Sequence, residues 1–129
     1  MPVPAVATYS LDILVAAQTV VKNAIDAGGA AGSIKFRSAT DVLLAEEALA
    51  YPCGTVNGTT GQLVLSIPTN VNAVAAGTAA YAEICNSAGA VKLALPAQAG
   101  VSPVSGYVVL NSLSIVAGVA VSVVSATIG

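Results

Sequence analysis

The closing stretch of the chain, residues 106–128, restricts the possible fold more than any other part of the sequence. It reads GYVVLNSLSIVAGVAVSVVSATI and is dominated by β-branched residues, which favour strands. We expect two strands joined at Ala117-Gly118, because apolar side chains nearly alternate along both runs. Successive strand side chains point to opposite faces, so one face is almost wholly apolar. The other face mixes aliphatic side chains with serines, namely Ser112, Ser114 and Ser122.

Charge is scarce in this chain and is absent after Lys92. Charged residues make up 8% of the sequence, against about a quarter in an ordinary soluble domain, and the mean hydropathy is +0.86. The apolar excess is mainly Ala and Val, with one Phe and no Trp, so we expect close backbone packing rather than a pocket for a small molecule. A surface with so little charge predicts burial against a partner.

Signals for membrane insertion, export and nucleic-acid binding are missing. No segment offers about 18 uninterrupted apolar residues, so no membrane partner is predicted. The N-terminal stretch lacks a basic start and carries Asp12 in its apolar part, which argues against a signal peptide and predicts use in a cytoplasm. Four basic residues and a net charge of −2 provide no basic patch, so no nucleic-acid partner is predicted either.

The two cysteines, Cys53 and Cys85, belong to no CxxC pair, and the chain has no histidine to work with them. Metal and redox motifs are therefore absent, and we predict no cofactor. The favoured interpretation is a pair of buried, reduced thiols that act as small hydrophobic side chains. A disulfide is the alternative.

Two N-terminal segments precede the predicted strands. Residues 1–9 contain Pro2 and Pro4, which exclude regular helix and predict an extended arm that docks on a neighbour. Residues 10–27 predict an amphipathic helix with Ser10 as its N-cap and glycines at its end, within a single domain of residues 10–129. Its predicted buried face comprises Ile13, Leu14, Ala17, Val20, Val21 and Ala24. Its predicted solvated face comprises Asp12, Gln18, Thr19, Lys22, Asn23 and Asp26.

The rest of the chain reads as short strands separated by turn residues. Strands are predicted at 33–38 and 62–67, and a hairpin joins 78–85 to 91–95 through the turn 86–89. Residues 96–103 are expected to form a loop. Residues 40–51 fit a short helix by composition, but Leu44, Glu46, Ala48 and Leu49 follow no clean period, and we favour an extended segment. The pattern predicts a mainly β fold, an antiparallel β-sandwich or jelly-roll-like domain with one N-terminal amphipathic helix.

No group of residues predicts catalysis. Glu46 and Glu47 are adjacent, so they point apart in a strand and form no acid–base dyad; a solvated surface pair is the expectation. Lys35 and Arg37 share one strand face and could bind a phosphate or an acidic partner, although two exposed charges beside a half-buried strand are ordinary. We predict no enzyme activity and no catalytic, cofactor-binding or metal site.

Four segments in order, NAIDAGGAAGSIKFRS, LLAEEALA, TAAYAEICNSAGAVKL and LNSLSIVAGVAVSVVSATI, carry a likeness to a known family. Over most of residues 20–128 the chain resembles small virion structural proteins of tailed bacteriophages. In that family a helix ending in D-A-G-G-G-A-G leads into a strand, a G-T-A-T-W-x-R hairpin ends in D-S-D-G, and an L-N-x-x-x-I-x-A-G strand pair closes the chain. Here Ala80-Tyr81 stands at the T-W position, the hairpin turn is less acidic, and LLAEEALAY is more helix-prone.

This resemblance implies a capsid decoration, or cement, protein on the outside of a phage head. The implied partners are the major capsid protein and further copies of the chain, as a dimer or a trimer. The implied location is the virion capsid surface, after assembly in the host cytoplasm. A tail or neck structural protein is the alternative that the resemblance leaves open, and an adhesin-like β module is less favoured.

Overall fold

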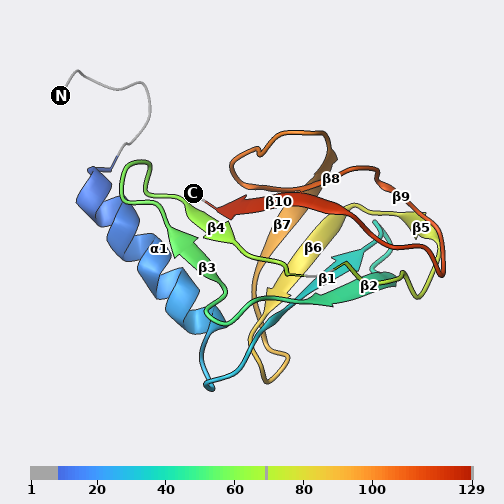
Figure 1. Ribbon diagram of the computed structural model, residues 1–129, viewed down its shortest axis with the longest axis horizontal. Coiled ribbons are helices and arrows are strands. Elements are labelled where there is room, and N and C mark those ends of the chain that lie inside the picture. The colour runs from blue at the N-terminus through green and yellow to red at the C-terminus, as the bar shows by residue number, and fades with distance from the viewer. Residues whose placement is uncertain (1–8, 69, 129) are drawn as a thin grey trace.

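The structure, a computed structural model, describes residues 9–68 and 70–128 and is mainly β with one helix (Figure 1). This confirms the broad prediction for the fold. Residues 1–8 of the predicted arm lie outside the described residues. The elements are α1 (Leu11–Ile25), β1 (Ser33–Arg37), β2 (Leu43–Ala48), β3 (Gly54–Val56), β4 (Leu63–Leu65), β5 (Gly77–Thr78), β6 (Tyr81–Cys85), β7 (Val91–Ala99), β8 (Tyr107–Leu110), β9 (Ser114–Ile115) and β10 (Val123–Ile128).

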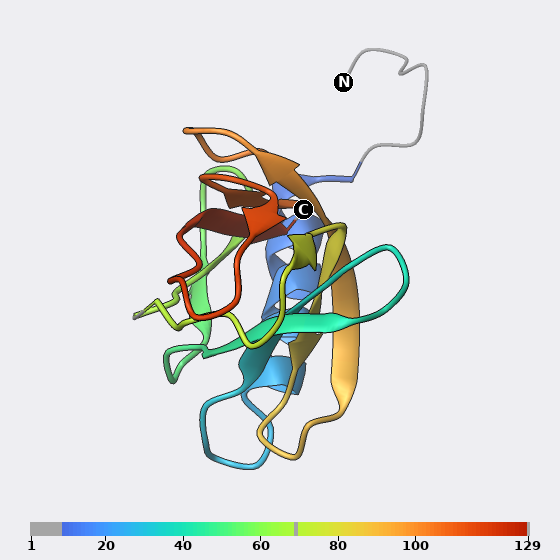
Figure 2. The ribbon, with the colours of Figure 1, turned by 90° about the vertical axis from the view of Figure 1, so that its right-hand side faces the viewer.

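Eight of the described strands form one curled sheet in the order β2-β1-β6-β7-β8-β10-β4-β3. The sheet curls into a half-barrel, which Figure 2 shows turned by 90° from the view of Figure 1. Residues 49–53 alone connect β2 at one edge to β3 at the other, so the two edges lie near each other. The strands β5 and β9 pair separately at the end of the molecule opposite α1. The predicted two-layer sandwich or jelly roll is not confirmed, because the described strands form one curled sheet and a small ladder.

The sheet is mixed, which departs from the predicted antiparallel arrangement. Strand β7 pairs with β6 in antiparallel fashion up to Pro96 and with β8 in parallel fashion from Ala97 to Ala99. Parallel neighbours usually need a crossover of a dozen or more residues. Here the overlap is three residues long, so residues 100–106 suffice to return the chain. The prediction of a loop from 96 onward was therefore wrong: Pro96, which has no N–H to donate, lies where the strand changes partner.

The C-terminal stretch forms two antiparallel strands, as predicted, with an excursion between them. Strand β8 pairs with β10 through Tyr107–Thr127 and Leu110–Val123. Between them the chain leaves the sheet, forms β9 against β5 and turns at Gly118, whose φ of 79° favours glycine. The predicted continuous strand over residues 107–116 is thus two short strands in different sheets.

Residues 43–48 are extended, which confirms the favoured interpretation of the ambiguous segment 40–51. On β1 the apolar and charged residues alternate as predicted, because Ile34 and Phe36 are fully buried while Lys35 and Arg37 are half-buried. Phe36, the only phenylalanine, lies in one continuous core of aliphatic side chains from most strands and from Ile25 of the helix. The core explains why β1 occupies a place inside the sheet.

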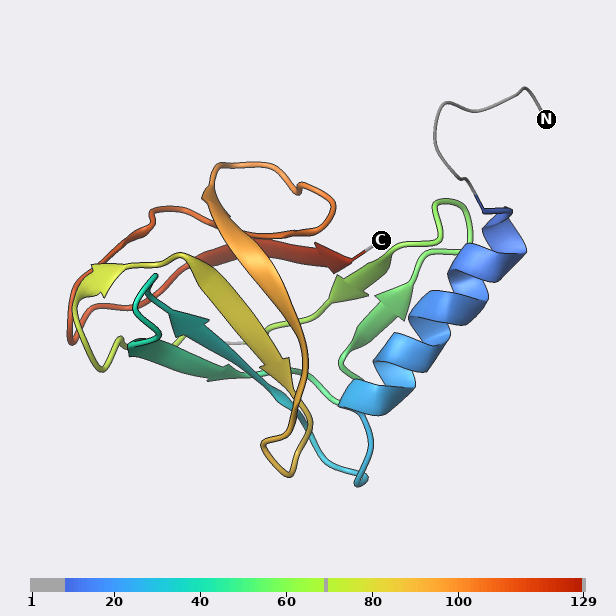
Figure 3. The ribbon, with the colours of Figure 1, turned by 180° about the vertical axis from the view of Figure 1, so that it is seen from behind.

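The helix lies along β3 and β4 and also contacts β7 (Figure 3). Its existence and its N-cap position Ser10 are as predicted, whereas its buried face is only partly so: Leu14, Val21 and Ala24 are half-buried, and the other three predicted residues are exposed. Leu14, Gln18, Val21 and Ile25 are buried or half-buried, and the side chains of Ile13 and Val20 are 50% and 68% exposed.

The physical reason for this rotation is a polar contact between the helix and the edge of the sheet. The Asp26 Oδ1 accepts the N–H of Cys53 at 2.9 Å, and Lys22 pairs with Asp26 at 3.4 Å. Part of the predicted solvated face therefore turns toward the backbone just before β3, which needs an acceptor. Apolar residues of the opposite side are left toward solvent.

Candidate functional site

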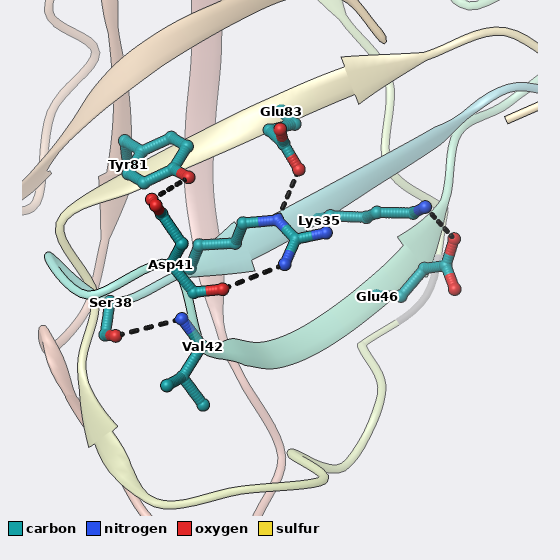
Figure 4. Close-up of polar contacts among 8 residues, drawn as sticks. Lys35, Ser38, Asp41, Val42, Glu46, Tyr81 and Glu83 are labelled. Atoms are coloured by element: carbon teal, nitrogen blue, oxygen red, sulfur yellow. Dashed lines mark hydrogen bonds and ion pairs between the residues drawn. The ribbon is translucent and has the colours of Figure 1, made fainter. Parts of the chain in front are cut away.

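The outer face of β2, β1 and β6 carries five of the ten charged residues of the chain. We call it the ion-pair face; its charged residues are Lys35, Arg37, Asp41, Glu46 and Glu83 (Figure 4). The register produces the gathering, because Lys35 lies opposite both Glu46 on β2 and Glu83 on β6. Alternation along β1 places these side chains on the face opposite the core.

Both cations of this face are paired. The Lys35 Nζ lies 3.9 Å from Glu46 Oε2, and the Arg37 Nε donates to Glu83 Oε1. This hydrogen bond is the main reason why the pKa of Arg37 is raised. Sequence reasoning placed Lys35 and Arg37 correctly on one face, yet the carboxylates of neighbouring strands oppose their charge. A phosphate or acidic partner would have to displace those carboxylates, so this face does not present a free anion site.

A second set of contacts fixes the turn between β1 and β2. Asp41 has a left-handed backbone with φ of 65°, and its carboxylate accepts the Tyr81 hydroxyl at 2.6 Å. Arg37 Nη1 donates to the carbonyl of Asp41 at 3.0 Å. Donation to Asp41 is also the largest cause of the raised pKa of Tyr81. The turn is thus tied to β1 and to β6, and its polar groups serve the fold.

Glu47 corrects the prediction of a solvated glutamate pair. Glu46 and Glu47 do point apart as predicted, but Glu47 points inward and its exposed fraction is 0%. Its Oε1 accepts the N–H of Val71 at 3.2 Å, whereas its buried Oε2 has no hydrogen-bond partner. Burial raises the pKa of Glu47, and the Val71 N–H opposes that rise. The acceptor of Val71 is 24 residues away in sequence, so local pattern gave no signal for this burial.

The segment held by Glu47 links β2 to the loop before β10. The Val74 N–H donates to the carbonyl of Leu44 on β2 at 2.8 Å. On its other side, the Val71 carbonyl accepts from Val121 at 2.9 Å, and Ala73 exchanges backbone hydrogen bonds with residues 118 and 119. Residues 71–74 therefore bridge β2 and the loop before β10.

Residues 93–128, which we call the uncharged region, present a different surface. Every residue here lacks a formal charge, and several large apolar side chains are exposed. They are Val101, Tyr107, Val116, Val119 and Val124. A shallow hollow of about 180 Å³ lies between residues 111–116, which include β9, and residues 119–122, which precede β10. Its lining includes Ser112, Ser114, Ser122, Val116 and Val119. These three serines, which the sequence placed on the less apolar strand face, are exposed.

Both cysteines are buried, as predicted, and are free thiols in this structure. Burial, with the nearby Asp26 carboxylate adding to it, raises the pKa of Cys53 to about 11. A thiol with such a pKa is a poor nucleophile at neutral pH. Cys53 therefore acts as a core side chain in this fold.

Within residues 9–68 and 70–128, no cluster of three or more histidine, cysteine or acidic side chains could hold a metal ion. None of the described helices is long and apolar enough to cross a membrane. Comparison of the chain with protein-family models, with curated proteins and with solved structures gave no match.

Proposed function

We propose that this protein is a non-enzymatic structural component of a tailed-phage virion, a capsid decoration or cement protein that binds the outside of the head and stabilises the shell. The ordered sequence motifs in residues 20–128 support the family, and the mainly β structure with one N-terminal helix agrees with it. The proposal does not depend on the sandwich or jelly-roll-like arrangement that the strand pattern predicted.

The observation that carries the proposal is the uncharged region. Charged residues are depleted in the buried centres of protein interfaces, and adhesion there comes from apolar area and close packing. Val101, Val116 and Val119 are each more than half exposed and have no charge beside them in sequence. Exposed apolar side chains without neighbouring charge suit permanent contact with another protein surface.

The proposed partners are the major capsid protein and further copies of this chain, as a dimer or a trimer. The proposed location is the capsid surface, reached by assembly in the host cytoplasm. Many copies on one shell would add modest contacts into durable attachment, because each bound copy keeps its linked neighbours at high effective concentration. Tight binding by a single copy is therefore not required.

The test is to purify intact particles from cells that carry the coding sequence and to locate the protein by gold-labelled antibody and mass spectrometry. Label spread over the head supports the proposal. Label on the tail or neck would replace it with the alternative virion role, and absence from purified particles would overturn it.

Matched variants connect the location to the surface. In Val116→Asp/Val119→Asp a charge enters the uncharged region, whereas in Val91→Asp it enters a half-exposed site beside Lys92. We expect the double variant to lose occupancy on particles and Val91→Asp to keep it. Equal occupancy of both would show that the uncharged region does not bind the shell.

A further inference from the structure

Asn57 and Gly58 form the exposed start of the turn between β3 and β4. The chain has six asparagines, and only Asn57 is followed by glycine. The Asn57 N–H donates to Gln62 at 2.7 Å, and its carbonyl accepts from Gly61 at 2.8 Å. The turn is therefore held at its base, while its tip projects into solvent.

The Asn57 side chain is held by two backbone donors. Its Oδ1 accepts the N–H of Thr59 at 2.8 Å and that of Thr60 at 3.2 Å. These donors polarise the carboxamide carbonyl and lie where negative charge would develop if a nucleophile attacked its carbon. The Asn57 carboxamide is thus activated as an electrophile in its resting position.

Gly58 supplies the nucleophile without hindrance. A Cβ added to it would meet no atom within 4 Å, and its N–H donates to no backbone acceptor within the described residues. Glycine also rotates more freely about its backbone bonds than any other residue, which five-membered ring closure requires.

We propose that Asn57-Gly58 is a site of spontaneous covalent modification, at which Asn57 deamidates through a succinimide. Solvent base removes the Gly58 amide proton, and the nitrogen forms a bond to Asn57 Cγ. Nδ2 takes a proton from water, and the Cγ–Nδ2 bond breaks with release of ammonia. Water then adds to either ring carbonyl and opens the ring to aspartate or isoaspartate. The product has one more carboxylate, so the net charge of −2 becomes −3.

The modification has a structural consequence because the turn rests on the helix. A Cβ on Gly61 would lie 2.6 Å from the Leu14 Cβ, which shows how closely turn and helix approach. Aspartate at position 57 keeps an acceptor for Thr59 and Thr60 and leaves the turn intact. Isoaspartate adds a methylene to the backbone and displaces the 57–62 hydrogen bonds.

Asn86 provides a control within the same chain. Its Oδ1 also accepts two backbone N–H groups, from Ala88 at 3.1 Å and Ala90 at 3.0 Å. The next residue is Ser87, whose hydroxyl donates to the Ala27 carbonyl at 3.1 Å. Both asparagine side chains thus accept two backbone N–H groups. The two sites differ in the residue whose nitrogen attacks, because Gly58 is unhindered whereas the Ser87 side chain is held by its hydrogen bond.

The experiment is to incubate the purified full chain at mildly alkaline pH and to follow each asparagine by peptide mapping with fragmentation that separates isoaspartate. We expect Asn57 to react at least about tenfold faster than Asn86, a barrier difference that one unhindered neighbour readily supplies. An acidic species should appear in parallel on anion exchange. In Gly58→Ala, which the open surroundings accommodate, the Asn57 rate should fall by about the same factor.

An Asn57 rate equal to or below that of Asn86 overturns the inference, as does an unchanged Asn57 rate in Gly58→Ala. No conversion at any asparagine also overturns it. The comparison of Asn57 with Asn86 uses the native chain alone, so it decides the matter even if the variant folds poorly.

Discussion

The ion-pair face carries charged side chains, whereas the uncharged region carries none. On the first, Lys35 and Arg37 are opposed by carboxylates of the adjacent strands, so the charges serve the sheet itself. On the second, valines are left exposed with no charge among residues 93–128. The difference teaches that the register of the strands pairs the charges of the first, whereas the exposed valines of the second have no such partner within the described residues.

The largest expected effect comes from the core directly behind the ion-pair face. Phe36→Ala removes the only phenylalanine, which is fully buried, and should lower the free energy of unfolding by about 3–5 kcal/mol. Denaturant unfolding measures this loss, with Phe36→Leu as the milder control. A loss below that of Phe36→Leu would show that the face is not organised by this core.

Glu47→Gln should give the next largest effect, and its sign depends on pH. The folded-state pKa of Glu47 is raised above its ordinary value of 4.5, so the folded state binds the proton more tightly than the unfolded chain. That contribution to stability is complete below the ordinary pKa and is lost as pH rises through the folded pKa. Rising pH therefore favours ionisation of Glu47, which its buried position in the core opposes.

Glutamine keeps an acceptor for the Val71 N–H and has no charge, so Glu47→Gln should flatten this part of the pH profile. The glutamine NH2 would have no more partner than Glu47 Oε2 has, so the expected gain comes from the missing charge: relative to the wild type, the variant should gain up to about 1.4 kcal/mol for each pH unit over which folding opposes ionisation of Glu47. Unfolding curves between mildly acidic and neutral pH check this, with Glu46→Gln as the exposed control. The same pH dependence in wild type and Glu47→Gln would contradict the raised pKa of Glu47.

Glu83→Gln tests whether the ion-pair face is held by charge, and its effect should be smaller. The variant leaves Arg37 with a neutral acceptor, so the unfolding midpoint should fall slightly and lose part of its salt dependence, since partly exposed pairs are screened. Lys92→Gln removes a charge outside the face and serves as the matched control. Equal salt dependence of wild type and Glu83→Gln would show that the pair contributes nothing.

The smallest expected effect sharpens the other side of the comparison. Val101 is 87% exposed, so Val101→Asp should change the free energy of unfolding by no more than about 0.5 kcal/mol. Thermal and denaturant unfolding of the isolated protein measure it. A large loss would mean that this loop is part of the fold and is not a surface left for a partner.

Local patterns predicted the elements that depend on local chemistry. The alternation of Ile34 and Phe36 with charged neighbours was sufficient for β1, and glycines marked the ends of the helix and the C-terminal turn. The predictions failed where a distant group decided the outcome. The hydrogen bond from the Cys53 N–H to Asp26 orients the helix, and the hydrogen bond from the Val71 N–H holds Glu47 in the core. Beyond Pro96, β7 pairs with β8.

The candidate site followed the same division. The absence of charge after Lys92 was visible in the sequence, and so was the shared face of Lys35 and Arg37. Their neutralisation was not, because it needs the register that places Glu46 and Glu83 opposite them. A spacing rule applied to one strand carries no information about its neighbours in a sheet.

The two edges of the half-barrel are partly covered, which affects how another copy of the chain could pair with them. Strand β2 has its outer carbonyl at Leu44 occupied by Val74, and β3 has the helix lying along it. An open strand edge invites another chain to extend the sheet without limit, which leads to fibres. Part of each edge is therefore occupied within the same chain, which leaves less free backbone for another copy to extend the sheet.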